Sequence, residues 1–96
     1  MKRKRIVIVR TYSAGCFAGE LVSRKGQEVV LANCRRLWSW VGGASLSQLA
    51  VTGSSNPQGC KFSVKTPRHE LTQAIEVIDM TPAAVAKLAE TPEWKA

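Results

Sequence analysis

Four consecutive β-branched residues near the start of the chain, Ile6-Val7-Ile8-Val9, constrain the fold more than any other feature. Branching at Cβ favours an extended backbone, and a strand places successive side chains on opposite faces of its sheet. Both faces of this segment are apolar. The sequence therefore predicts a strand over residues 5–12 that is covered on both sides.

Turn residues divide the rest of the chain into short segments. Further strands are predicted over residues 16–23, 28–32, 35–40, 60–65 and 70–79. The strand over 5–12 and the first three of these form a predicted meander of four short strands. Pro67 lacks an amide hydrogen and restricts its strand to an edge or an end. In the strand over 35–40, alternation puts Arg36, Trp38 and Trp40 on one face, with Arg35, Leu37 and Ser39 on the other.

Capping residues predict two short helices. Ser45 is placed to cap a helix over 45–50 that turns Leu46, Leu49 and Ala50 inward. Thr81-Pro82 provides a cap followed by proline at the first helical position, and Pro92 follows the end of this second helix. The predicted fold class is α+β and mostly β, a curled antiparallel sheet of five or six strands with one or two short helices.

The length of 96 residues favours one domain over residues 1–96, with a basic flank at 1–4 and a C-terminal helix at about 82–90. So small a domain leaves much of its surface exposed, and most aromatic residues fall outside the second helix. We therefore expect a homo-oligomer, in which another copy covers some of these rings.

The chain has 14 Lys and Arg against 7 Asp and Glu, a formal charge of +7. This excess favours an anionic partner such as a small nucleotide, a nucleic acid or an acidic protein face. Four of the cations lie in residues 2–5, where a basic run is most often a solubilising flank. No apolar run suits a signal peptide or a membrane span, so we expect a cytoplasmic protein without a membrane partner.

The sequence predicts a protein that is not an enzyme, with no catalytic residue, metal or cofactor. The sequence contains neither of the two common glycine-rich phosphate-binding motifs, G-x-x-x-x-G-K-[ST] and G-x-G-x-x-G, and it has no nucleophile-elbow sequence G-x-S-x-G. Cys16, Cys34 and Cys60 lack the spacing of a zinc site or a disulfide framework, so they are expected to be small apolar residues. His69 is expected to be an exposed residue beside a strand.

Two segments could bind a ligand. In Tyr12–Gly19, small residues and two glycines allow close approach of the backbone, with Tyr12 and Phe17 on either side; a plain hairpin turn is the alternative. Asn33–Trp40 interleaves arginine with tryptophan, which suits a nucleotide's phosphates and base, although a subunit interface and core packing remain alternatives. The candidate ligand-binding residues are Arg10, Tyr12, Ser13, Phe17, Arg35, Arg36, Trp38, Trp40, Ser45, Ser47 and Gln48.

Several segments resemble a recurrent family of small phage-encoded proteins. They are Arg10–Gly19, Arg35–Trp40, Ala44–Ala50, Asn56-Pro57, Cys60–Phe62 and Leu71–Ile78. The chain is also similar in character to the phage sponge proteins that counter the Thoeris defence, which sequester cyclic ADP-ribose-type signals between the subunits of a homo-oligomer. This resemblance implies a counter-defence protein that binds a cyclic nucleotide or a cyclic ADP-ribose-type immune signal in the host cytoplasm without cleaving it.

In that hypothesis each group of candidate residues has a role. Arginines hold phosphates: Arg10, Arg35 and Arg36. Aromatic rings stack on bases: Tyr12, Phe17, Trp38 and Trp40. Polar residues around the first predicted helix contact ribose or base edges: Ser45, Ser47 and Gln48. Two alternatives remain, an anti-CRISPR-type inhibitor of a host nuclease effector and a small nucleic-acid-binding module.

Overall fold

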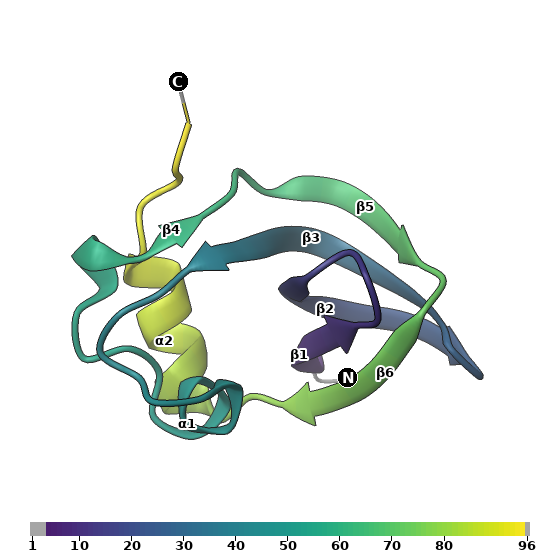
Figure 1. The fold of residues 1–96 in the computed structure, drawn as a ribbon, viewed down its shortest axis with the longest axis horizontal. Helices are drawn as coiled ribbons and strands as arrows, with labels where there is room; N and C mark the ends of the chain where they lie inside the picture. Colours follow the sequence, from purple (N-terminus) through teal and green to yellow (C-terminus); the bar gives the residue numbers. More distant parts are fainter. Residues whose placement is uncertain (1–3, 96) are drawn as a thin grey trace.

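The computed structural model describes residues 4–95, which form six strands, two α-helices and one 3-10 helix (Figure 1). The strands are β1 (Ile6–Thr11), β2 (Cys16–Lys25), β3 (Glu28–Ser39), β4 (Lys61–Phe62), β5 (Thr66–Leu71) and β6 (Ala74–Asp79). The helices are α1 (Leu46–Val51), α2 (Pro82–Glu90) and the 3-10 helix η1 (Pro57–Gly59). The predicted mostly β, α+β fold class is confirmed. Of the predicted basic flank, residues 1–3 lie outside the described part of the chain.

All the strands pair antiparallel in one sheet with the order β4-β3-β2-β1-β6, and β5 pairs with β3 on the edge that β4 also uses. β5 and β6 thus lie at opposite edges of the sheet, yet only Thr72 and Gln73 connect them. So short a connection requires the sheet to curl until its edges approach each other, as Figure 1 shows. The backbone amide of Ala74, at the start of β6, donates to the carbonyl of Gln27, just before β3, at 3.0 Å, so a hydrogen bond joins the two sides of the curled sheet.

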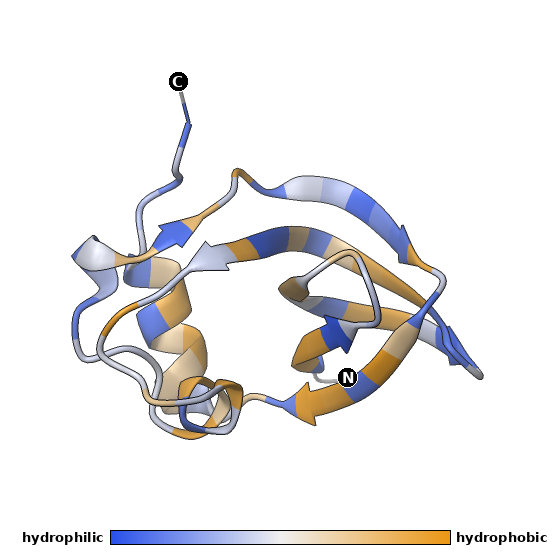
Figure 2. Cartoon of the chain, in the orientation of Figure 1, coloured by the Kyte–Doolittle hydropathy of each residue, from blue (hydrophilic) through white to orange (hydrophobic). Residues whose placement is uncertain are grey.

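The sheet separates two apolar clusters, and β1 contributes to both, as its sequence predicted. Val7 and Val9 face the inner core, which the curled strands enclose, while Ile8 faces an outer core beneath the helices. In Figure 2 the hydrophobic colour runs along β1 and most of β6, whereas β5 is mainly hydrophilic. The buried residues of the inner core are Val7, Val9, Phe17, Val29, Leu31, Cys34, Leu71 and Ala74. Those of the outer core are Ile8, Ala18, Leu37, Leu49, Ala50, Cys60 and Phe62.

The predicted meander of four short strands is wrong, because residues 28–32 and 35–40 belong to one long strand, β3. At Asn33 the backbone adopts φ 49°, and the register against β2 shifts there. Leu31 and Cys34, three residues apart, therefore both face the inner core. Across the irregularity lies Gly19, where a Cβ atom would come within 3.1 Å of the Ala32 carbonyl oxygen. A bulge thus continues the strand where the sequence suggested a break.

A second irregularity in β3 overturns the predicted grouping of Arg36, Trp38 and Trp40 on one face. Leu37 pairs with Phe62 and Ser39 with Lys61, so two steps along β3 match one step along β4. Beyond this point the alternation is reversed, and Trp40 packs against the outer core together with Leu37.

Two other predicted strands have different limits in the structure. The predicted strand over 70–79 is interrupted at Thr72–Gln73, where β5 ends and β6 begins. The predicted strand over 60–65 shortens to the two residues of β4. Pro67 lies in β5, whose one strand partner is β3, in agreement with the predicted edge position.

Both helix starts are confirmed. The Ser45 hydroxyl accepts a hydrogen bond from the Gln48 amide at 3.2 Å, and the Thr81 hydroxyl accepts one from the Ala84 amide at 3.1 Å. Each bond satisfies an amide that a helix leaves without an internal partner in its first turn. The predicted inward face of α1 is also present, because Leu49 and Ala50 are buried and Leu46 packs against the outer core.

The Arg35 side chain fastens α2 and β4 to the sheet. It is only 3% exposed, and its guanidinium lies on the helix side of β3. Its five N–H groups donate at 2.9–3.3 Å to the carbonyl oxygens of Phe62, Ser63, Leu88, Thr91 and Pro92. Carbonyls at a helix C-terminus lack intrahelical donors and carry partial negative charge, so a buried cation stabilises them. Arg35 is therefore a structural residue.

Replacing Arg35 by Met is expected to lower the free energy of unfolding by at least about 3 kcal/mol, because several buried carbonyls lose their donor. Urea denaturation followed by circular dichroism measures this loss. Arg24→Met, on the exposed β2–β3 hairpin, is the matched control and is expected to change stability by about 0.5 kcal/mol or less. Equal effects of the two substitutions would contradict the structural role of Arg35.

Candidate functional site

A cavity of about 250 Å³ opens at one end of the inner core, and we call it the arginine pocket. Its lining residues are Thr11, Ser13, Ala14, Phe17, Arg36, His69, Glu70, Leu71, Thr72 and Gln73. Three of the predicted ligand-binding residues meet here, namely Ser13, Phe17 and Arg36. Phe17 is fully buried beneath Arg36 and His69, so its predicted stacking on a base is wrong. The pocket thus joins residues from both segments that the sequence singled out.

Two chain connections form one side of this pocket. In the β1–β2 connection, the Thr11 hydroxyl donates to the Gly15 carbonyl at 2.7 Å and accepts from the Ala14 amide at 2.9 Å. Gly15 has φ 99°, a conformation that glycine adopts without strain. The Ser13 hydroxyl donates to the side-chain oxygen of Gln73 at 2.8 Å, linking this connection to the one between β5 and β6. The rim of the pocket is therefore held together by hydrogen bonds.

Arg36 brings a positive charge to the pocket. Its guanidinium carbon lies 4.8 Å from the centre of the Phe17 ring. Its Nε atom is buried without a hydrogen-bond partner among residues 4–95, and in that range its guanidinium forms no ion pair. The acidic residue of the lining, Glu70, is instead paired with Arg68 at 2.6 Å. Arg36 can therefore offer its donors to an anion that enters the pocket.

His69 forms another wall, so the prediction that it is an exposed flanking residue is wrong. It lies within β5, half-buried, with its ring centre 4.9 Å from that of Phe17. Its Nδ1 atom is 3.1 Å from the Thr66 hydroxyl oxygen, and that hydroxyl donates its one hydrogen to the Cys34 carbonyl at 2.8 Å. Nδ1 must therefore be the donor to Thr66. Burial, and next the charge of Arg36, lower the pKa of His69 below its usual 6.5.

The other two predicted phosphate ligands do not reach the arginine pocket. All five N–H groups of Arg35 are engaged by carbonyls, so its predicted phosphate contact is wrong. Arg10 is exposed, and its Nε lies 3.2 Å from the carboxylate of Glu76. Tyr12, a predicted stacking residue, is 71% exposed and does not line the pocket.

The remaining candidates lie elsewhere. Trp38 is 62% exposed and stacks on Trp94 with ring centres 6.0 Å apart, whereas Trp40 packs against the outer core. Ser45 and Gln48 are occupied at the start of α1, where the Gln48 side-chain oxygen also accepts from the Ala44 amide at 2.8 Å. Ser47 is exposed on the same helix. The prediction that all these residues share one site is wrong, because α1 packs on the outer core and the pocket opens from the inner one.

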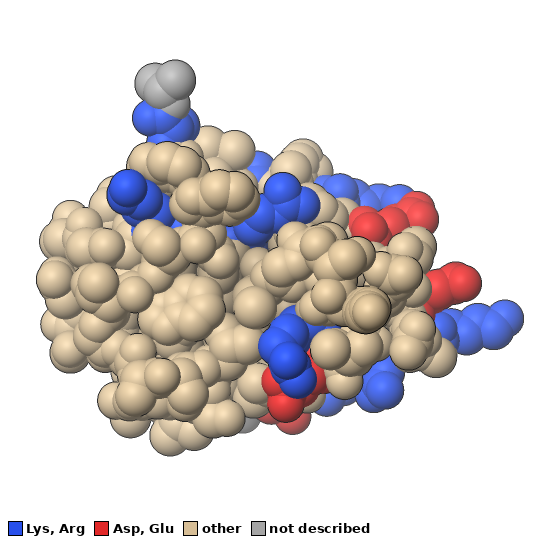
Figure 3. Space-filling model, in the orientation of Figure 1, with Lys and Arg blue, Asp and Glu red and all other residues tan. Residues whose placement is uncertain are grey.

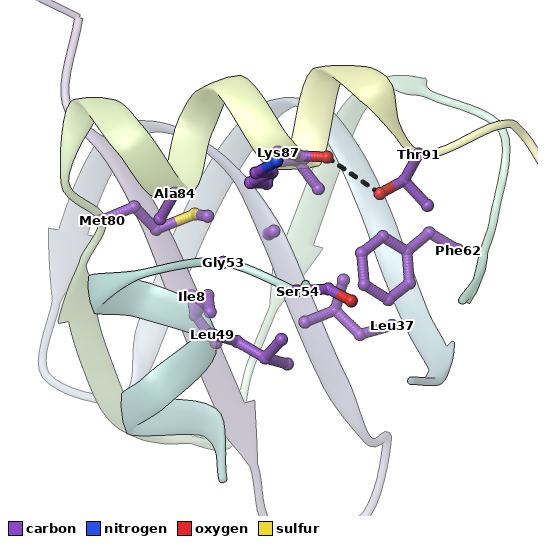
Figure 4. Close-up of a pocket in the computed structure, with 12 residues that line it drawn as sticks. Ile8, Leu37, Leu49, Gly53, Ser54, Phe62, Met80, Ala84, Lys87 and Thr91 are labelled. Carbon is purple, nitrogen blue, oxygen red and sulfur yellow. Dashed lines mark hydrogen bonds between the residues drawn. The ribbon is translucent and has the colours of Figure 1, made fainter. Parts of the chain in front are cut away.

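Two further hollows are less suited to an anion. The first, about 20 Å³, lies between α2 and the sheet and is lined mainly by apolar side chains such as Ile8 and Leu49 (Figure 4). It has room for about one water molecule. The second, about 570 Å³, borders the other side of α2. Its charged lining residues are Lys4, Glu20, Arg35, Lys65 and Glu93. Lys4 lies 3.5 Å from Glu20, every N–H group of Arg35 is engaged and Glu93 balances Lys65, so the cavity offers an anion little net attraction.

Sequence reasoning missed His69 and Gln73 in the pocket and Trp94 beside Trp38. All three reach their neighbours through long-range pairing. His69 lies opposite Leu31, and the Trp94 amide donates to the Phe62 carbonyl at 2.8 Å. No local pattern in a single sequence identifies such a partner.

A family model described as a domain of unknown function, DUF6948, matches residues 4–88. No curated protein and no solved structure matches the chain. Within the described residues, no helix has the length and apolar character needed to cross a membrane.

The lowered pKa of His69 predicts a specific pH dependence of stability. Since the unfolded chain binds the proton more readily, the free energy of unfolding should fall as the pH drops from about 6.5 towards the pKa of the folded state, and level off below it. His69→Gln should lack this component. Chemical denaturation of both proteins at several pH values between about 7.5 and 5 measures the difference. Parallel pH profiles of the free energy of unfolding for the two proteins would contradict a lowered pKa of His69.

Proposed function

We propose that this chain, which belongs to the DUF6948 family, binds the phosphate group of a small anionic ligand such as a nucleotide and holds the ligand without altering it. One observation carries the proposal, the Arg36 guanidinium in a pocket where no carboxylate of residues 4–95 pairs with it. Phosphate matches guanidinium in charge and in hydrogen-bonding geometry. Phe17 supports the guanidinium from one side, so its donors are left for the ligand.

The size of the pocket limits how much of a ligand it can enclose. Cavities that hold a whole drug-sized molecule measure about 300–1,000 Å³, and the arginine pocket measures about 250 Å³. A phosphate and part of the attached ribose would fill it, leaving the base near the rim. There the Ser13 hydroxyl and the Gln73 amide are placed to contact sugar or base edges, at the cost of their mutual hydrogen bond.

The more specific role belongs to the same proposal. A protein that sequesters a cyclic nucleotide or a cyclic ADP-ribose-type immune signal in the cytoplasm of a phage-infected cell must cover most of the ligand to hold it tightly. A pocket that encloses only the phosphate end favours a homo-oligomer, in which a second copy covers the rest. The positive net charge of the chain would speed the encounter with such a ligand.

The test compares Arg36→Gln with Arg24→Gln, which removes the same charge from the exposed hairpin. Isothermal titration uses AMP, cyclic dinucleotides, cyclic trinucleotides and cyclic ADP-ribose isomers, with recovery of the ligand after denaturation. The wild-type protein should bind at least one of these and release it intact. Arg36→Gln should weaken that binding about tenfold or more, because a charge-assisted contact contributes about 1.5–3 kcal/mol.

Three outcomes would overturn the proposal. They are the absence of binding across the panel, equal affinities of the two variants, and recovery of a cleaved ligand. Urea denaturation of both variants establishes that each is folded, so that a loss of binding reports on the pocket.

A further inference from the structure

A pair of stacked tryptophans lies on the surface, away from the arginine pocket. Trp38 and Trp94 are 62% and 48% exposed, and their ring planes meet at 24° with centres 6.0 Å apart. The Lys61 ammonium lies 5.4 Å from the Trp94 ring centre. We call these three residues the tryptophan surface. Large rings that remain this exposed in a small protein indicate a binding surface.

The backbone holds both rings in place. Trp38 lies at the second irregularity of β3, and its neighbours Leu37 and Ser39 pair with β4. The segment after α2 runs beside β4, where Glu93 bridges to Phe62 in parallel and the Trp94 amide donates to the Phe62 carbonyl at 2.8 Å. Arg35 holds the same segment through the Thr91 and Pro92 carbonyls. A partner would therefore meet rings that are already positioned, which reduces the entropy lost on binding.

The charges around the tryptophan surface are mostly positive. The Lys61 ammonium lies over the Trp94 ring, and Lys65 and Lys95 lie around Glu93, the residue before Trp94. The Glu93 carboxylate is 3.3 Å from the Lys65 backbone amide and 3.9 Å from the Lys95 ammonium. Figure 3 shows Lys and Arg beside the C-terminal end of the chain on this face, whereas at the opposite end of the molecule Lys and Arg alternate with Asp and Glu. Exposed aromatic rings beside lysines complement a polynucleotide strand, which carries both unstacked bases and phosphates.

We infer that the tryptophan surface binds single-stranded nucleic acid, with an unpaired base stacked on the outer face of the Trp38–Trp94 pair and backbone phosphates beside Lys61, Lys65 and Lys95. Bases in a duplex are covered by their neighbours, whereas those of a single strand present a free face to an aromatic side chain. This surface shares no residue with the arginine pocket, and the inference stands apart from the proposed ligand there.

A second copy of the chain fits this surface less well. A two-fold contact centred on the tryptophans would bring the lysines of one copy close to those of the other, and each chain carries a formal charge of +7. Such repulsion opposes self-association through this surface. A polyanion removes the repulsion and releases the counterions that the lysines and phosphates attract.

The experiment measures fluorescence anisotropy of labelled twelve-residue oligothymidine and oligouridine, and of a duplex of the same length, against the full chain. Trp38→Ala and Trp94→Ala should each weaken binding of the single strands about fivefold or more. Tyr12→Ala removes another exposed ring and should leave binding unchanged. Lys61→Gln should weaken binding more than the charge-matched Lys25→Gln on the β2–β3 hairpin.

A second readout uses a Trp40→Phe background, in which the emission comes from Trp38 and Trp94 alone. Single strands should quench this emission, and the affinity should fall as salt rises, with a slope of about −0.7 for each phosphate contacted. Equal binding by Trp38→Ala and the wild type, a preference for duplex, or a lack of quenching would overturn the inference. So would sedimentation showing a dimer that Trp38→Ala dissociates, combined with no oligonucleotide binding.

Discussion

The buried guanidinium of Arg35 is the interaction on which the arrangement of this protein depends. A sheet this small cannot bury a large area against a nine-residue helix, so packing alone fixes α2 weakly. Arg35 adds five charge-assisted hydrogen bonds that join β3 to β4, to the end of α2 and to the segment after it. Arg35 therefore positions β4, the end of α2 and the segment that carries Trp94.

Arg35 and Arg36 are consecutive in β3, so the pleat of the strand directs their side chains to opposite faces of the sheet. Arg35 projects towards a helix end rich in free carbonyls, while Arg36 projects to the inner side, where it meets the face of Phe17. There a buried Nε has no acceptor among residues 4–95, which costs stability. In the proposed function, an anion in the pocket would bind this guanidinium and would stabilise the folded state in proportion to its affinity.

Local features of the sequence predicted much of this fold, because their causes lie within a few residues. The β-branched run of β1, the caps Ser45 and Thr81 and the proline that opens α2 needed no distant partner.

The course of β3 could not be predicted in the same way. The first irregularity depends on Gly19 in β2 and joins two predicted strands into one. The second depends on the pairing with β4 and reverses the alternation from which the faces of Arg36, Trp38 and Trp40 were assigned. The predicted site therefore divided: Ser13, Phe17 and Arg36 meet in one pocket, while Trp38 joins a tryptophan more than fifty residues away in the sequence.

The two proposed anion-binding surfaces raise the question of why their cations are not paired with acidic residues of the same chain. The answer lies in the placement of its acidic groups. Glu20 is 3.5 Å from Lys4, Asp79 is 2.7 Å from Arg5 and Glu76 is 3.2 Å from Arg10, so several of the seven acidic residues are matched to cations of β1 and its flank. Arg36 and Lys61 receive no such partner within the described residues. Because like charges repel across so compact a fold, leaving these two unmatched opposes folding. An anionic partner at either surface would relieve that repulsion, and the stability of the domain would then be coupled to binding.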